Sequence, residues 1–211
     1  MEANFTQLFD SVINGDQESV KVLVKQHLEE GASPQAILNA GLIAAMTEVG
    51  NRFESGDFFV PEMLVAARAM QGGLSILKPL LVQQGVKTTG KVVIGTVKGD
   101  LHDIGKNLVA MMLEGTGFEI VDLGTDVSPE RFVGAVQQHQ PNVVAMSALL
   151  TTTMVNMKAT INALTDAGVR QKVKVIVGGA PVTRAYAEQI GADGFGTDAS
   201  RAVAVAKELV G

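Results

Sequence analysis

The residues with the clearest chemical potential are Asp100 and His102, which stand two positions apart in residues 99–107, GDLHDIGKN. This stretch follows an apolar run at 91–97, which predicts a buried strand, and precedes 104–116, which predicts a helix. In a parallel α/β sheet such loops lie at the carboxyl edge, where ligands bind. A carboxylate that holds one imidazole nitrogen fixes the tautomer and makes the other nitrogen a better metal donor. A lone histidine can therefore serve as a single axial ligand to a metal in a macrocycle, the alternative being a structural or surface role.

Several other chemistries do not fit this loop. Five residues separate Gly99 from Gly105, where a phosphate-binding P-loop has four, and Asn107 stands where a P-loop needs Ser or Thr. The dinucleotide fingerprint G-x-G-x-x-G is also absent from the loop. The chain has no cysteine, which removes thiolate metal sites and cysteine nucleophiles. Nucleophilic catalysis lacks a partner set, because His139 is not expected to meet His102. Zinc needs three or four ligands, and one histidine with aspartates does not supply them.

Composition narrows the class of partner. The net charge is −5 without a basic cluster, and aromatic residues make up only 4% of the chain, so a nucleic-acid partner is not expected. No run approaches the roughly 18 apolar residues of a membrane span, and the N-terminus does not have the pattern of a signal peptide. The absence of cysteine fits a reducing compartment. We therefore expect a cytoplasmic protein without a membrane partner.

Residues 1–86 have helical periodicity. Apolar positions and breakers predict four amphipathic helices at about 5–13, 16–30, 34–55 and 61–81, and their short connections predict an antiparallel four-helix bundle. The last turn is unusually apolar, with Phe53, Phe58, Phe59 and Val60 close together. These side chains either staple the two helices as part of the core or cover a flat apolar ligand.

Residues 91–211 alternate between strand and helix patterns. Strands are predicted at 91–97, 118–123, 143–147, 173–178 and 194–196, with a helix after each, and residues 84–90 are the predicted linker. The fold class is thus α + α/β, a helical bundle followed by a flavodoxin-like, doubly wound parallel sheet of order 2-1-3-4-5. In that order the loops after the first and third strands face one crevice. Gly178 and Gly179 end the fourth strand nearby and leave room for a ligand.

Three motifs together resemble those of a known family. The run Asp100-x-His102-x-x-Gly105 resembles the cobalamin-binding D-x-H-x-x-G motif, and Ser147-x-Leu149 and Gly178-Gly179 resemble its two companions at matching intervals. Residues 1–86 are similar to the cap domain that precedes the corrinoid domain in methionine synthase and in the corrinoid proteins of methyltransferase systems. The resemblance implies that cobalamin or a related cobamide binds base-off, with His102 as the lower axial cobalt ligand in place of the cofactor's own base.

The resemblance also implies a role for each matching residue. Asp100 would hold His102, and Thr153 would complete the ligand relay where methionine synthase has a serine. The remaining implied cofactor contacts lie in the motif loop, at the ends of the third and fourth strands, before the last helix and in the cap: Leu101, Asp103, Ile104, Gly105, Ser147, Leu149, Thr151, Gly178, Gly179, Ala199, Phe53 and Val60. Phe53 and Val60 match the pair that packs over the upper corrin face.

The function implied by the resemblance is that of a methyl shuttle. A substrate-specific methyltransferase would load a methyl group onto Co(I), and a second methyltransferase would transfer it from Co(III) to tetrahydrofolate or coenzyme M. A reductive activation protein is a further implied partner. The chain has no substrate-binding barrel, so it is not expected to complete a reaction alone. Since the methyl group must reach two partners, we expect the cap to move about the linker.

Three alternatives are weighed against the shuttle. A cobalamin-dependent transcriptional sensor would carry a basic helix-turn-helix and a cap Trp, and the chain has no Trp. The small subunit of an adenosylcobalamin mutase shares the histidine loop but not the helical cap. A cofactor-free receiver module would need clustered acidic residues at the strand ends. The resemblance implies that the pocket that selects the methyl donor lies on the partner, and that the donor is methanol, a methylamine, a methoxylated aromatic or a quaternary amine.

Overall fold

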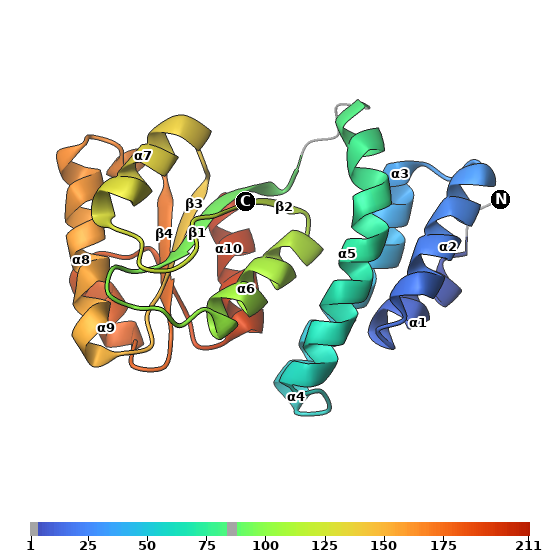
Figure 1. Cartoon of the computed structure of the whole chain (residues 1–211), viewed down its shortest axis with the longest axis horizontal. Helices are drawn as coiled ribbons and strands as arrows, with labels where there is room; N and C mark the ends of the chain where they lie inside the picture. Colours follow the sequence, from blue (N-terminus) through green and yellow to red (C-terminus); the bar gives the residue numbers. More distant parts are fainter. Residues whose placement is uncertain (1–3, 84–87) are drawn as a thin grey trace. The chain divides into compact units, whose positions relative to one another are not determined.

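The computed structural model describes residues 4–83 and 88–211, and the chain divides into two compact units, Met1–Lys87 and Thr88–Gly211 (Figure 1). The linker predicted at 84–90 lies partly at 84–87, outside the described residues. Its last residue, Gly90, is already the first residue of strand β1, so the predicted linker extends too far. Each unit is built around its own core and is described by itself.

The first unit is helical. It contains α1 (Thr6–Ile13), α2 (Gln17–Glu29), a third helix made of α3 (Pro34–Ala36), η1 (Ile37–Ile43) and α4 (Ala44–Ser55), and α5 (Val60–Gln83). The four predicted helices are therefore confirmed. The Asp16 carboxylate accepts the Ser19 N–H at 3.0 Å and begins α2, and Ser33 caps the third helix with Pro34 at its first position. Helix α5 packs against α1, α2 and α4. The fully buried core side chains include Leu8, Val12, Val20, Val24, Ile37, Leu42, Val49, Met63 and Leu77.

The third helix differs from the prediction in one respect. Residues Ile37–Ile43 form a π-helix, in which each hydrogen bond spans one more residue than in an α-helix. Within this segment Gly41 packs so closely on α1 that a Cβ would lie 2.6 Å from Leu8 Cδ2. Over seven residues the apolar pattern does not distinguish the two helical periods, so the sequence gives no warning of the change.

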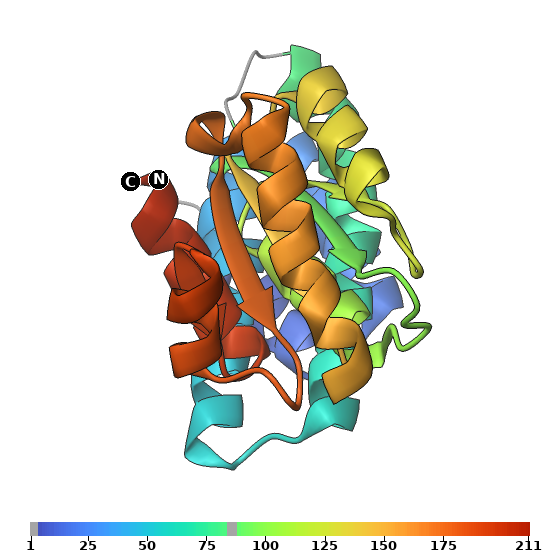
Figure 2. The same cartoon turned by 90° about the vertical axis from the view of Figure 1, so that its left-hand side faces the viewer.

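The second unit is a parallel sheet covered on both faces, and its strand order β2-β1-β3-β4-β5 confirms the prediction. The strands are β1 (Gly90–Thr96), β2 (Phe118–Asp122), β3 (Val143–Ser147), β4 (Lys174–Gly178) and β5 (Gly194–Gly196). Helices α6 (Ile104–Gly115) and α10 (Ala199–Val210) cover one face (Figure 1). Helices α7 (Pro129–His139), α8 (Thr151–Asp166) and α9 (Arg184–Ile190) cover the other (Figures 1 and 2). Because both faces are buried, the central strands are almost wholly apolar.

Strand register brings the functional loops to one edge of the sheet. Thr96 at the end of β1 pairs with Ser147 at the end of β3, which pairs with Gly178 at the end of β4, which pairs with Gly196 at the end of β5. The four carboxyl ends are therefore level. Strand β2 lies on one side of β1, and β3, β4 and β5 follow on the other side, so the strand order reverses between β1 and β3. This reversal makes the edge the topological switch point where doubly wound sheets bind ligands.

Candidate functional site

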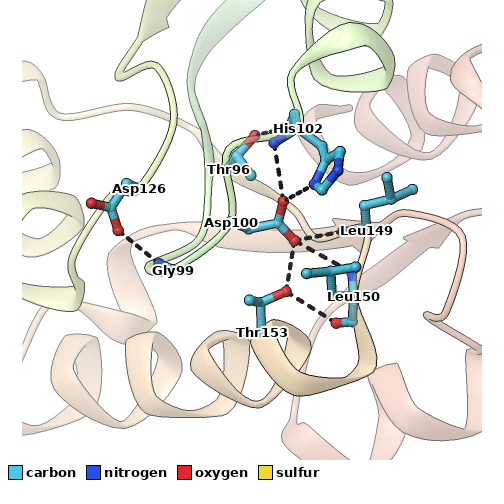
Figure 3. Close-up of polar contacts among 8 residues, drawn as sticks. All are labelled: Thr96, Gly99, Asp100, His102, Asp126, Leu149, Leu150 and Thr153. Carbon is cyan, nitrogen blue, oxygen red and sulfur yellow. Dashed lines mark hydrogen bonds and ion pairs between the residues drawn. The ribbon is translucent and has the colours of Figure 1, made fainter.

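The Asp100 carboxylate is the centre of the polar contacts at this edge (Figure 3). Its side chain is completely buried. Oδ1 lies 2.7 Å from His102 Nδ1 and accepts the His102 backbone N–H at 3.1 Å. A buried acceptor at this distance favours the tautomer with the proton on Nδ1 and leaves the Nε2 lone pair for another partner.

The second oxygen of Asp100 faces the loop after β3. Oδ2 accepts the Thr153 hydroxyl at 2.6 Å and the backbone N–H groups of Leu149 and Leu150 at 2.8 and 3.3 Å. Leu150 is the N-cap of the 16-residue helix α8, so the carboxylate lies where a helix end supplies free N–H groups and a positive partial charge. Asp100 thus joins the loops that follow β1 and β3.

The hydrogen bonds keep Asp100 ionised. Burial by itself raises the pKa of a carboxyl group, because the low-dielectric interior disfavours the charge. Here the donors on Thr153, Leu149 and His102 outweigh burial and hold the pKa of Asp100 well below its ordinary value of 3.8. The carboxylate is therefore a fixed negative charge beside the imidazole.

The His102 ring is open to solvent although its backbone is fixed. About half of the side chain, 51%, is exposed. The buried Thr96 hydroxyl donates to the His102 carbonyl at 2.9 Å, which attaches the loop to the end of β1. Within the described residues no group of three or more His, Cys, Asp or Glu side chains could hold a metal ion. The site therefore offers one nitrogen ligand, which suits a metal whose other positions are filled by a macrocycle.

Large apolar side chains around His102 are exposed. Leu101 and Ile104, on either side of the histidine in the loop, are 73% and 75% exposed, and Leu149 and Leu150 are also exposed. Beside Ile104, a Cβ on Gly105 would meet nothing within 4 Å. Clustered exposed apolar residues mark a binding surface. An apolar platform around one imidazole fits a broad, flat cofactor, and we call these four leucine and isoleucine residues the apolar platform.

The other predicted residues of this unit lie at the same edge without direct contact to Asp100. Ser147 and Gly178 end β3 and β4, Thr151 is exposed at the first turn of α8, and Ala199 is buried at the start of α10. Gly179 has φ +122°, and a Cβ there would lie 1.9 Å from the Ala148 carbonyl oxygen. Only glycine fits, so the β4 loop can lie directly against the residue that precedes Leu149.

Asp103 ends the histidine loop, directly before the first residue of α6. The Asp103 side chain does not cap α6; its Oδ2 accepts from Asn107 Nδ2 at 3.0 Å.

Phe53 and Val60, the predicted cofactor contacts of the cap domain, belong to the helical unit, where they lie at the turn between α4 and α5. In that turn Arg52 stacks over the Phe58 ring at 5.3 Å, while Phe59 is exposed.

Sequence reasoning missed three contributors to the site. These are Thr96, the backbone N–H groups of Leu149 and Leu150, and Asp126, whose Oδ1 accepts the Gly99 N–H at 2.7 Å. A threonine that ends an otherwise apolar strand was the one available signal. Nothing in the sequence marks which amide or which aspartate reaches the loop.

Fold and site together define a class: a cofactor-binding protein with a helical unit and a flavodoxin-like unit that presents one half-exposed histidine at the carboxyl edge of its sheet. The family model described as "B12 binding domain" matches residues 90–204, and a second model with the same description matches residues 5–78. The chain therefore belongs to the B12-binding corrinoid proteins and binds a corrinoid of the cobalamin type.

Similar proteins of known name agree with this family. Trimethylamine corrinoid protein 2 of Methanosarcina acetivorans is 45% identical over 196 residues, which cover 92% of this chain and 90% of the relative. The dimethylamine corrinoid protein of Methanosarcina barkeri is 43% identical over 206 residues, covering 97% and 96%. The crystal structure of the methanol:cobalamin methyltransferase complex MtaBC from Methanosarcina barkeri matches with a TM-score of 0.87 and 30% identity, covering 98% of this chain and 79% of that one.

Among the described residues, no helix has the length and apolar character needed to cross a bilayer.

Proposed function

We propose that the chain is the methyl-carrying corrinoid subunit of a methyltransferase system and that His102 holds the corrinoid from below, with the cofactor's own base displaced. The observation that supports this most is the buried Asp100 carboxylate, which fixes His102 through Nδ1 at 2.7 Å while half of the ring stays exposed. The Asp100 carboxylate accepts hydrogen bonds from the loops after β1 and β3. A histidine with only a structural role does not need a buried carboxylate held in this way.

Each residue of the site has a distinct part in this function. When bound, the corrinoid supplies the cobalt centre that carries the methyl group. His102 offers Nε2 as the ligand, and Asp100 holds the proton on Nδ1. Thr153 keeps the carboxylate in place through its hydroxyl at 2.6 Å. The apolar platform removes water from the lower side of the site.

The remaining predicted contacts complete the cofactor site in this proposal. Ser147 and Thr151 face the nucleotide tail, Gly178 and Gly179 give it space at the end of β4, and Ala199 borders it. Phe53 and Val60 of the helical unit cover the upper corrin face. These assignments follow the resemblance to the cobalamin motifs, and the common strand edge of the α/β residues supports them.

Two methyltransferases and an activating protein are the proposed partners. Relatives named for trimethylamine and dimethylamine, at 45% and 43% identity, favour a methylated amine as the donor. The acceptor is tetrahydrofolate or coenzyme M, reached through the second methyltransferase, and the third partner restores the reduced cobalt by electron transfer. The protein acts in the cytoplasm in this proposal.

The proposal is tested by loading the purified protein with hydroxocobalamin and following the methyl group. The reduced, loaded protein is incubated with ¹⁴C-labelled trimethylamine, dimethylamine, monomethylamine or methanol, each with a methyltransferase specific for that donor. Label that co-elutes with the protein for one amine is the expected result. A protein that takes up no cobalamin, or a loaded protein that gains no label from any donor or from iodomethane, contradicts the carrier function.

A further inference from the structure

The segment after β2 lies against the loop that carries His102. Asp126 in this segment makes two hydrogen bonds to consecutive residues of that loop, and Figure 3 draws the one to Gly99. Its Oδ1 accepts the Gly99 N–H at 2.7 Å, and its backbone N–H donates to the Asp100 carbonyl at 3.0 Å. The two bonds hold the peptide groups on both sides of the Gly99–Asp100 link, just before the carboxylate that orients His102.

Asp126 adopts an uncommon backbone conformation to make these bonds. Its φ is +53°, and in the described parts of the chain only Gln140 shares a positive φ among non-glycine residues. Such a conformation costs free energy for most side chains and persists where surrounding structure imposes it, although Asp and Asn tolerate it best. The flanking residues impose it here, because the Gly124 carbonyl accepts the Thr96 N–H and the Val127 N–H donates to the Thr96 carbonyl, both at 2.9 Å.

The same segment is also attached to the far end of the histidine loop. Lys106, which follows the motif glycine, is buried, and its Nζ lies 2.5 Å from Asp122 Oδ2 at the end of β2. The other oxygen of Asp122 accepts the Gly124 N–H at 2.8 Å. Residues 122–127 therefore contact the histidine loop on both sides, at Gly99 and Asp100 through Asp126 and at Lys106 through Asp122. The position of Asp100 depends on these contacts.

We propose that Asp126 is a positioning residue for the cobalt ligand: it holds the Gly99–Asp100 turn so that the Asp100 carboxylate meets His102 Nδ1. This inference rests on the proposed role of His102 as the axial ligand. The Asp126 side chain acts as a hydrogen-bond acceptor in this role. Its charge is secondary, because the carboxylate is exposed to solvent.

Two substitutions separate the acceptor from the backbone conformation. Asp126→Asn keeps an acceptor oxygen and tolerates positive φ, whereas Asp126→Gly accepts the conformation but removes the acceptor. A matched control lies at the opposite edge of the sheet. Asp193 accepts the Val175 N–H at 2.6 Å and donates its own N–H to the Val175 carbonyl at 2.8 Å. Asp193→Gly therefore removes the same kind of bond away from the site, together with the 2.8 Å ion pair between Asp193 and Arg170.

The first readout uses the apo-protein, and the second uses cobalamin. Amide hydrogen exchange at Gly99 should be about tenfold faster in Asp126→Gly and close to wild type in Asp126→Asn and Asp193→Gly. Hydroxocobalamin should bind Asp126→Gly roughly three- to tenfold more weakly, and with cob(II)alamin a smaller share of the bound cofactor should have a nitrogen of ¹⁵N-labelled protein as its axial ligand by electron paramagnetic resonance. Asp126→Asn should restore both properties.

Three outcomes would overturn the inference: Asp126→Gly equal to wild type in exchange and histidine ligation, Asp126→Asn as impaired as Asp126→Gly, or Asp193→Gly as impaired in histidine ligation as Asp126→Gly. A failure of the proposed function looks different. In that case wild-type protein itself shows no histidine ligation, whatever the Asp126 variants do.

Discussion

Replacing Asp100 with Asn tests how the carboxylate controls His102. The amide keeps one oxygen and turns the other into a donor. At the Oδ2 position the new NH₂ would face the fixed N–H groups of Leu149 and Leu150, which are donors at 2.8 and 3.3 Å. Together with the Thr153 hydroxyl these are three donors at Oδ2 against one at Oδ1, the His102 backbone N–H at 3.1 Å, so the oxygen stays on the α8 side. The NH₂ then faces His102 Nδ1 at the 2.7 Å position. Nδ1 must then accept, so the ring proton moves to Nε2 and blocks the nitrogen that binds metal.

The size of the effect follows from this change of tautomer. Loss of a residue that orients a metal-bound histidine typically weakens metal binding by about 10- to 100-fold, or about 1.4–2.8 kcal/mol. We expect a loss in this range for cobalamin binding to Asp100→Asn. The fold should survive, because the amide oxygen still accepts from α8. Asp166→Asn, an exposed substitution at the last residue of α8, makes the same change of charge in the same unit and serves as the control.

Two measurements check this prediction. Apo-protein of each variant is titrated with hydroxocobalamin and followed by visible absorbance, and ¹⁵N chemical shifts of the His102 ring in the apo-protein report its tautomer. The expected result is weaker binding together with a protonated Nε2 in Asp100→Asn alone. The reasoning would be refuted if Asp100→Asn bound cobalamin within about twofold of wild type and kept its ring proton on Nδ1.

Three further predictions concern Asp100 and the residues near it. Thr153→Val removes the hydroxyl that donates to Asp100 at 2.6 Å in a buried site, so it should lower the free energy of unfolding in urea by about 1–2 kcal/mol and weaken cobalamin binding. Thr153→Ser keeps the hydroxyl and should stay near wild type. Equal losses in both variants would contradict a role for the hydroxyl. In Gly179→Ala the new Cβ would lie 1.9 Å from the Ala148 carbonyl oxygen, so circular dichroism should show that the α/β unit does not fold stably. In Gly105→Ala the new Cβ meets nothing within 4 Å, so the apo-protein should keep its thermal stability but bind cobalamin less well. Folding lowers the pKa of Asp100, so its contribution to stability is present above its unfolded pKa of 3.8 and is lost as the pH falls below that value. The stability of the apo-protein should therefore fall more steeply with acid in wild type than in Asp100→Asn. Parallel curves of stability against pH would show that Asp100 is not held ionised.

The sequence predicts the fold well because its signals are local and periodic. Apolar runs such as 91–97 and 143–147 have the continuous character of strands buried on both faces, and Asp16, Ser33 and Ser128 begin helices as their side chains suggest. The alternation of strands and helices fixes the parallel topology and with it the edge where the loops meet. The π-helix at Ile37–Ile43 was not predicted, because an apolar pattern of seven residues does not distinguish a π-helix from an α-helix.

In the site, too, residues within sequence motifs were predicted, whereas contacts that depend on the tertiary fold were not. Asp100, His102 and Thr153 were predicted together, through a resemblance to cobalamin motifs, and the structure places their side chains in contact. The amides of Leu149 and Leu150 could not be predicted, because every residue has an N–H and only the register of Thr96 with Ser147 brings these two to Asp100. The role of Asp126 could not be predicted for a similar reason, because Asp126 follows β2 in the chain and reaches Gly99 only in the folded structure.

The most direct test asks whose nitrogen lies below the cobalt. Protein labelled uniformly with ¹⁵N and loaded with unlabelled cob(II)alamin is compared by electron paramagnetic resonance with unlabelled protein. Nitrogen-14 as axial ligand splits each cobalt line into a triplet, and nitrogen-15 splits it into a doublet. If His102 is the ligand, the labelled protein gives doublets and His102→Ala loses them. Triplets that persist in the labelled protein would mean that the cofactor's own base stays on the metal, and His102 would not be the ligand.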